Sequence, residues 1–150
     1  MAGVIITIFA GLIGTGGMTL VMWLIHKSGM ANADMVRAIG SLFSRNLDES
    51  LAPGLIIHFI IGSLIAFIYV ILISLFHPTS VAATIGTGAL IGIFHGVAFS
   101  FLLVIAVAEH HPLEEFRDAG LEVALSHLLG HVVYGLLVGA VIGIAGVRFF

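Results

Sequence analysis

The chain has 150 residues, of which 60% are hydrophobic and 9% are charged, with a formal net charge of −3. A soluble domain carries about a quarter charged residues, and a domain this small cannot hide so much apolar surface from water, so the composition predicts an integral membrane protein. The absence of cysteine excludes disulfides and thiolate metal sites, and the few Lys and Arg residues leave nucleic-acid binding without support.

Four apolar stretches are long enough to cross a bilayer, which takes about 20 helical residues. The first covers about residues 3–25. Because nothing basic precedes it and it exceeds the apolar part of a signal peptide, we interpret it as a retained helix. The others cover about residues 53–76, 81–108 and 121–147. Their short connections predict antiparallel neighbours in a single transmembrane domain.

The segment 34–46, between the first two stretches, has the pattern of an amphipathic helix. Its apolar stripe consists of Met35, Val36, Ile39, Leu42 and Phe43. Asn32 or Asp34 can cap its start. We expect a short helix lying in the headgroup region, or alternatively a helix that docks a partner.

Basic residues are distributed unequally between the two sides of the predicted bundle. Lys27, Arg37 and Arg45 lie between the first two stretches and Arg117 between the last two, whereas only Arg148 falls on the opposite side. Because cytoplasmic loops are enriched in Lys and Arg, this distribution predicts that both termini lie outside the cytoplasm.

The two halves of the chain resemble copies of one another. Residues 13–16 (Ile-Gly-Thr-Gly) recur at 85–88, and the spacing of His58, Gly62 and Ala66 recurs in His131, Gly135 and Gly139. Two copies of two spans each would be parallel, related by an axis along the membrane normal. This arrangement would bring His58 and His131 to matching depths on opposite sides of the axis.

Small residues spaced by four accompany the histidines of the apolar stretches. Such rows let helix backbones approach closely, so the histidines beside them are expected to point into the bundle rather than at lipid. The expected helix-packing positions are Gly62, Ala66, Gly88, Gly92, Gly96, Gly135, Gly139 and Gly143.

Histidines within the apolar stretches are candidate site residues, because ionisable groups are costly to place in a membrane. His58 and His131 could ligate a haem b through two axial imidazoles, and together with His95 and His127 they could instead hold a copper, iron or zinc ion. One alternative is that each ring hydrogen-bonds a carbonyl, a hydroxyl or a tyrosine of a neighbouring helix. Another is a proton or substrate pathway. No catalytic residues are recognisable.

The loop of residues 109–118 resembles a metal-binding cluster by composition, since it holds two histidines among acidic residues. Pro112 begins a helical turn, however, which leaves His110 and His111 outside it and spoils an i, i+4 pairing. We expect a solvated polar turn.

The segments around His58 (Ile57 to Gly62), around His131 (Leu129 to Gly135) and the glycine-rich third stretch with His95 together resemble small bacterial four-helix membrane proteins. They are similar to the YagU-like and related uncharacterised inner-membrane families, and residues 37–43 resemble the short helix that follows the first span there. The resemblance implies the fold and an inner-membrane location, and lends no reaction.

The prediction is an all-α, compact integral membrane four-helix bundle, built from two parallel helix-pair repeats plus a short interfacial amphipathic helix. The first functional hypothesis is a non-catalytic accessory or structural subunit that contacts the lipid bilayer and other membrane subunits, or that self-associates. The alternatives are a haem- or metal-binding redox protein and a small oligomeric transporter or channel, although so tight a bundle leaves little room for a pore.

Overall fold

The computed structural model describes residues 1–102 and 108–150 in full and the helical course of residues 103–107. The elements of the described chain are the helices α1 (Ala2–Ser28), α2 (Met35–Ser44), α3 (Leu51–Leu75), α4 (Val81–Ala108) and α5 (Leu121–Ala145), with a 3₁₀ turn η1 (Glu114–Phe116) before α5. The described residues form no strand. The all-α prediction is therefore confirmed.

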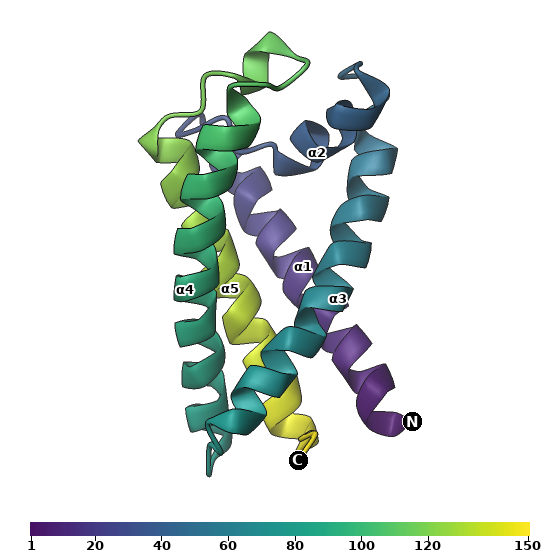
Figure 1. Cartoon of the computed structure of the whole chain (residues 1–150), viewed down its shortest axis with the longest axis vertical. Helices are drawn as coiled ribbons and strands as arrows, with labels where there is room; N and C mark the ends of the chain where they lie inside the picture. The colour runs from purple at the N-terminus through teal and green to yellow at the C-terminus, as the bar shows by residue number, and fades with distance from the viewer.

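Helices α1, α3, α4 and α5 are long and apolar enough to cross a membrane, which makes the chain an integral membrane protein. Large apolar side chains such as Leu64 and Phe94 are exposed on the outside of the bundle, as lipid contact requires. Figure 1 shows both termini at one end of the molecule and α2 with the η1 segment at the other.

The ends of the helices follow local chemistry. Gly29 and Gly146 adopt left-handed φ angles of 75° and 65° after α1 and α5, a conformation that glycine adopts without steric penalty. The side chain of Asp34 caps α2 by accepting a hydrogen bond from the Arg37 backbone N–H at 3.1 Å. The other cap candidate, Asn32, instead donates to the Glu115 carbonyl at 2.8 Å, which ties the start of α2 to η1.

The pairs α1–α3 and α4–α5 pack through equivalent positions. In both pairs, small residues let the backbones touch, and the contacts correspond at the 73-residue offset of the histidine motif. The equivalent contacts are Thr15 with Gly62 and Gly88 with Gly135, and Gly11 with Ala66 and Thr84 with Gly139. This correspondence supports the predicted repeat of two helix pairs.

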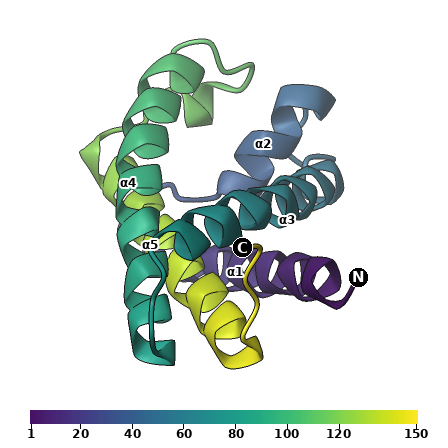
Figure 2. The ribbon, with the colours of Figure 1, turned by 60° about the horizontal axis from the view of Figure 1, so that its bottom comes forward.

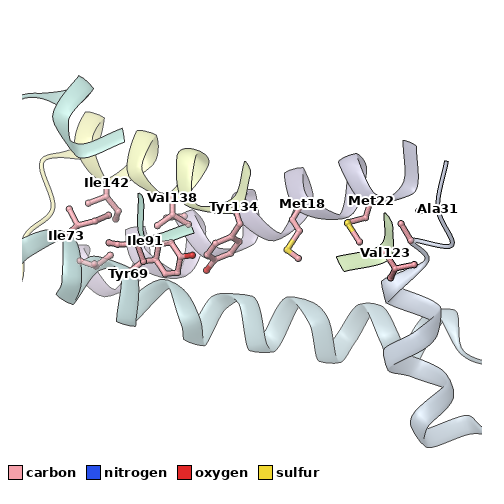
Figure 3. Close-up of a cluster of buried hydrophobic side chains, with 13 residues drawn as sticks. Met18, Met22, Ala31, Tyr69, Ile73, Ile91, Val123, Tyr134, Val138 and Ile142 are labelled. Atoms are coloured by element: carbon pink, nitrogen blue, oxygen red, sulfur yellow. The ribbon is translucent and has the colours of Figure 1, made fainter. Parts of the chain in front are cut away.

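The two pairs meet through α1 and α5, and the core lies along this contact. Met18 and Met22 of α1 follow one another along the core with Tyr134 and Val138 of α5, and Tyr69 of α3 packs its ring against Tyr134 at a centroid distance of 5.1 Å (Figure 3). Each of these side chains is at most 4% exposed.

The corresponding contact between α3 and α4 is not made along their whole length. The two helices meet at the turn that joins them and diverge toward the end that carries α2 (Figures 1 and 2). The close contacts expected from the glycine rows are made within the pairs. They place no constraint on the distance between α3 and α4, so tightly packed pairs still leave a space on this side.

Helix α2 lies across the start of α3 and packs on it tightly. A Cβ atom added at Gly40 would overlap the Ser50 carbonyl, and one added at Gly54 would overlap the Val36 carbonyl. This contact buries Val36. The other residues of the apolar stripe of α2 face the space between α3 and α4, and they are Met35, Ile39, Leu42 and Phe43.

Candidate functional site

A cavity of about 460 Å³ lies between the diverging helices α3 and α4, within the size range of small-molecule sites. Helices α1 and α5 form its floor, α2 and α3 one wall, and α4 with the segment before α5 the other (Figure 2). Its walls are mostly apolar. The apolar lining residues include Met18, Met35, Ile39, Leu42, Phe43, Ile57, Ile61, Ile65, Phe99, Phe116 and Val123.

The structure brings the four predicted histidines, His58, His95, His127 and His131, to this one cavity from α3, α4 and α5. His58 and His131 are buried, and the rings of His95 and His131 meet edge to face at a centroid distance of 4.5 Å. Among the described residues, no three His, Asp or Glu side chains are placed to hold a metal ion together. The haem and metal assignments stay predictions.

Hydrogen bonds determine the tautomers of His127 and His131. The Nδ1 atom of His127 lies 2.8 Å from the Val123 carbonyl, and that of His131 lies 2.7 Å from the His127 carbonyl. A carbonyl oxygen only accepts, so both Nδ1 atoms carry the hydrogen. In the neutral ring the remaining nitrogen, Nε2, then presents a lone pair.

His58 differs from these two rings because its unpartnered nitrogen is buried. Its Nε2 atom is buried and makes no hydrogen bond within the described part of the chain. Burying a polar atom without a partner costs about 1–3 kcal/mol. Three buried side-chain atoms have no partner within the described chain, Nδ1 of His26, Nε2 of His58 and Oγ of Ser100, and of these three residues His58 alone lines the cavity. His58 is therefore the one that a molecule bound in this cavity could complete.

Two tyrosines hold the inner end of the cavity in place. The Tyr69 hydroxyl lies 3.0 Å from Nδ1 of His95, and the Tyr134 hydroxyl donates to the Gly62 carbonyl at 2.6 Å. The Tyr69 contact is of the kind that the hydrogen-bonding alternative expects for His95. It joins α3 to α4 just beyond the point where they diverge.

His111 is a residue of the site that sequence reasoning missed. It is 2% exposed, its Nε2 lies 3.0 Å from the Ala38 carbonyl of α2, and its own carbonyl accepts from the Arg117 side chain at 2.6 Å. The expectation of a solvated polar turn is therefore wrong at His111. The available signal was Phe116, an aromatic side chain in an acidic loop, whose ring packs against His111 at 4.9 Å.

The cavity opens at an acidic end and along apolar sides. Asp34, Glu115 and Asp118 lie at the end formed by α2 and η1, and the described lining residues include no Lys or Arg. Along the sides, Ile61 and Phe99 line the cavity and are about half exposed. Because these two side chains belong to helices that span the membrane, this side opens toward lipid.

Comparison with known proteins gives a family and no activity. The model of a family described as a family of unknown function, DUF6789, matches residues 1–148. No curated protein and no solved structure matches the chain. An uncharacterised family agrees with what the resemblance implied, but the narrower likeness to YagU-like proteins is not confirmed.

Proposed function

Since the chain belongs to the DUF6789 family, whose function is unknown, we propose a function from the geometry of the site: the protein binds a small apolar or amphipathic molecule in the cavity between α3 and α4. The observation that carries the proposal is a cavity of about 460 Å³ with apolar walls and histidines on its floor. Apolar pockets with a few convergent polar groups are typical of ligand sites.

The unpaired His58 nitrogen supports binding over simple helix packing. If the histidines served only to join helices, each would be expected to find a partner on a neighbouring helix, as His95 does with Tyr69. His58 has none for its Nε2 atom within the described chain. A ligand that hydrogen-bonds this atom would offset the cost of burying it.

The closed inner end of the cavity supports binding over conduction. Beyond the tyrosines, the space between the helices is filled by the buried side chains Val70, Ile73, Val138 and Ile142, three of which Figure 3 labels. A pocket of this form admits a molecule from the lipid side and offers it no path to the opposite end.

Ile61 and its neighbour Ile60 provide the test. Both are exposed to a similar extent, 50% and 56%, but only Ile61 lines the cavity. Ile61→Trp is expected to narrow the cavity, whereas Ile60→Trp places the same bulk on the lipid-facing side. We expect a compound recovered near 1:1 by organic extraction and mass spectrometry from the wild type and from Ile60→Trp, and lost from Ile61→Trp. Equal recovery from all three proteins, or none from the wild type, would contradict the proposal.

Haem or metal binding is the second candidate, because the tautomers of His127 and His131 favour it. Metal-ligating histidines commonly donate their second ring N–H to a carbonyl, as both rings do here. A visible spectrum and a metal analysis of the purified protein test this candidate. A Soret band or stoichiometric metal that is lost in His131→Ala would support it, and a colourless, metal-free protein would remove it.

An accessory or structural role in a larger membrane complex remains a prediction of the sequence. The glycine contacts at Gly88 and Gly135 are made inside the chain, so a partner would have to bind elsewhere. Identification of the proteins that co-purify in mild detergent tests this role independently of the cavity.

A further inference from the structure

The hydrogen bonds on the cavity floor determine which chemical group the floor can accept. Building on the proposed binding function, we propose that the polar end of the bound molecule is an uncharged hydroxyl group, as in a long-chain alcohol or an alkylphenol. This hydroxyl donates a hydrogen bond to Nε2 of His127 or His131, while the apolar part of the molecule fills the space toward α2 and the lipid-facing side.

The floor offers acceptors. The Nδ1 hydrogens of His127 and His131 are already engaged by backbone carbonyls, so each neutral ring has only a lone pair left. The Tyr134 hydroxyl is likewise engaged as a donor, to Gly62, and can only accept from a ligand. His58 lines the same cavity, its Nε2 has no partner within the described chain, and its neutral ring carries one N–H that can donate to a ligand. A ketone or an ether could accept from His58, but it would place its lone pairs against Nε2 of His127 and His131. A donor group fits them, and a hydroxyl oxygen can in addition accept from its surroundings.

The charges around the cavity exclude an anion. Asp34, Glu115 and Asp118 lie at its α2 end, and no Lys or Arg is present among the lining residues that the structure describes. Arg37 pairs with Asp34 at 3.5 Å but does not line the cavity. A fatty acid or a phosphate inside the cavity would therefore meet the carboxylates of Glu115 and Asp118 with no cation among the described lining residues. An ammonium group would be attracted to the mouth, but placing its charge at the histidine floor within the membrane is costly. An uncharged donor avoids both the repulsion by the carboxylates and the cost of placing a charge within the membrane.

Three probes that differ only in the polar group test the inference. Para-octylphenol donates a hydrogen bond, para-octylanisole replaces the hydroxyl by a methyl ether, and para-octylbenzoate is an anion. Binding is measured by equilibrium retention on the whole protein in phosphatidylcholine nanodiscs, with empty nanodiscs subtracted because all three probes enter lipid. We expect the phenol to bind about tenfold more tightly than the anisole, the effect of one net hydrogen bond, and the benzoate to bind most weakly.

Variants assign the effect to the floor. One of His127→Leu and His131→Leu, whichever removes the accepting Nε2, is expected to lower the phenol affinity toward that of the anisole and to leave the anisole affinity unchanged. His26→Leu is the control, because His26 lines a separate pocket. If a leucine variant does not fold, the ratio of phenol to anisole affinity on the wild type still decides. Equal affinities, or a benzoate that binds most tightly, would overturn the hydroxyl inference and leave the proposed function intact. Binding of none of the probes would overturn both.

Discussion

Gly86 and Gly88 are the same residue type in the same helix, but only Gly88 is required by its surroundings to be glycine. Both belong to the Ile-Gly-Thr-Gly motif of α4, two positions apart. A Cβ atom added at Gly88 would overlap the backbone carbonyl of Gly135, whereas one added at Gly86 would meet no atom within 4 Å. Gly88 is required by the α4–α5 contact, and Gly86 lies at a surface that no helix covers.

We therefore expect opposite outcomes from the same substitution at these two sites. Gly88→Ala forces the two backbones apart and should destabilise the protein by about 1–3 kcal/mol, as overpacking does. Gly86→Ala adds a methyl group to an open helix surface and should change stability by less than about 1 kcal/mol, toward greater stability. Unfolding of both variants in a series of detergent mixtures measures the difference. Equal loss at both positions would show that the α4–α5 contact is not made as described.

The segment between α4 and α5 is positioned by its contacts with α2. His111 connects it to α2 through the Ala38 carbonyl, Asn32 connects it to the start of α2 through the Glu115 carbonyl, and Arg117 folds back onto His111. These contacts place the segment and α2 on opposite sides of the cavity end and hold them at a fixed distance.

Removal of the His111 side chain is expected to release this segment without unfolding the bundle. His111→Ala leaves the Leu113 backbone N–H without the ring nitrogen that accepts from it at 3.1 Å. Amide hydrogen exchange of residues 109–120 should therefore rise by about tenfold or more, since one lost buried hydrogen bond is worth on the order of 1–3 kcal/mol. Exchange in the middle of α5 should not change. Glu114→Ala, an exposed change in the same segment, serves as the control and should match the wild type.

The elements themselves could be predicted from the sequence, and the cavity could not. Uninterrupted apolar stretches specify membrane helices because each must satisfy its own backbone in lipid, and the four-residue glycine spacing identified the faces on which Gly88 and Gly135 meet. The burial of His111 depends on α2, about seventy residues earlier in the chain. No local pattern reports a contact over that separation.

The repeat misled the prediction at the scale of the whole molecule. Equivalent halves imply that each contact between the pairs has a symmetric counterpart, and Gly14 of α1 packs against Tyr134 of α5. The positions that correspond at the 73-residue offset, Thr87 of α4 and Ile61 of α3, are not buried, and Ile61 lines the cavity instead. The α1–α5 contact therefore has no α3–α4 counterpart at this depth. The cavity lies between α3 and α4, whose divergence Figure 2 shows. The candidate site is a consequence of broken symmetry, which a comparison of the two halves does not reveal.

Orientation in the membrane is the remaining property of the whole molecule, and the chain is well suited to measuring it. It contains no cysteine, so single cysteines at the exposed positions Glu49, Thr79 and Glu109 can be labelled without background. The first and last lie at the α2 end, and Thr79 lies in the turn between α3 and α4 at the opposite end (Figure 1).

Because four of the five basic residues, including Lys27, Arg37 and Arg117, lie at the α2 end or in its connections, this end is expected in the cytoplasm. A membrane-impermeant thiol reagent added to intact cells should label Thr79→Cys and spare Glu49→Cys and Glu109→Cys, which should react only after permeabilisation. The reverse pattern would invert the orientation but keep the four crossings. Labelling of Thr79→Cys and Glu49→Cys from the same side would contradict the crossing of α3, and with it the placement of His58 and the cavity within the bilayer.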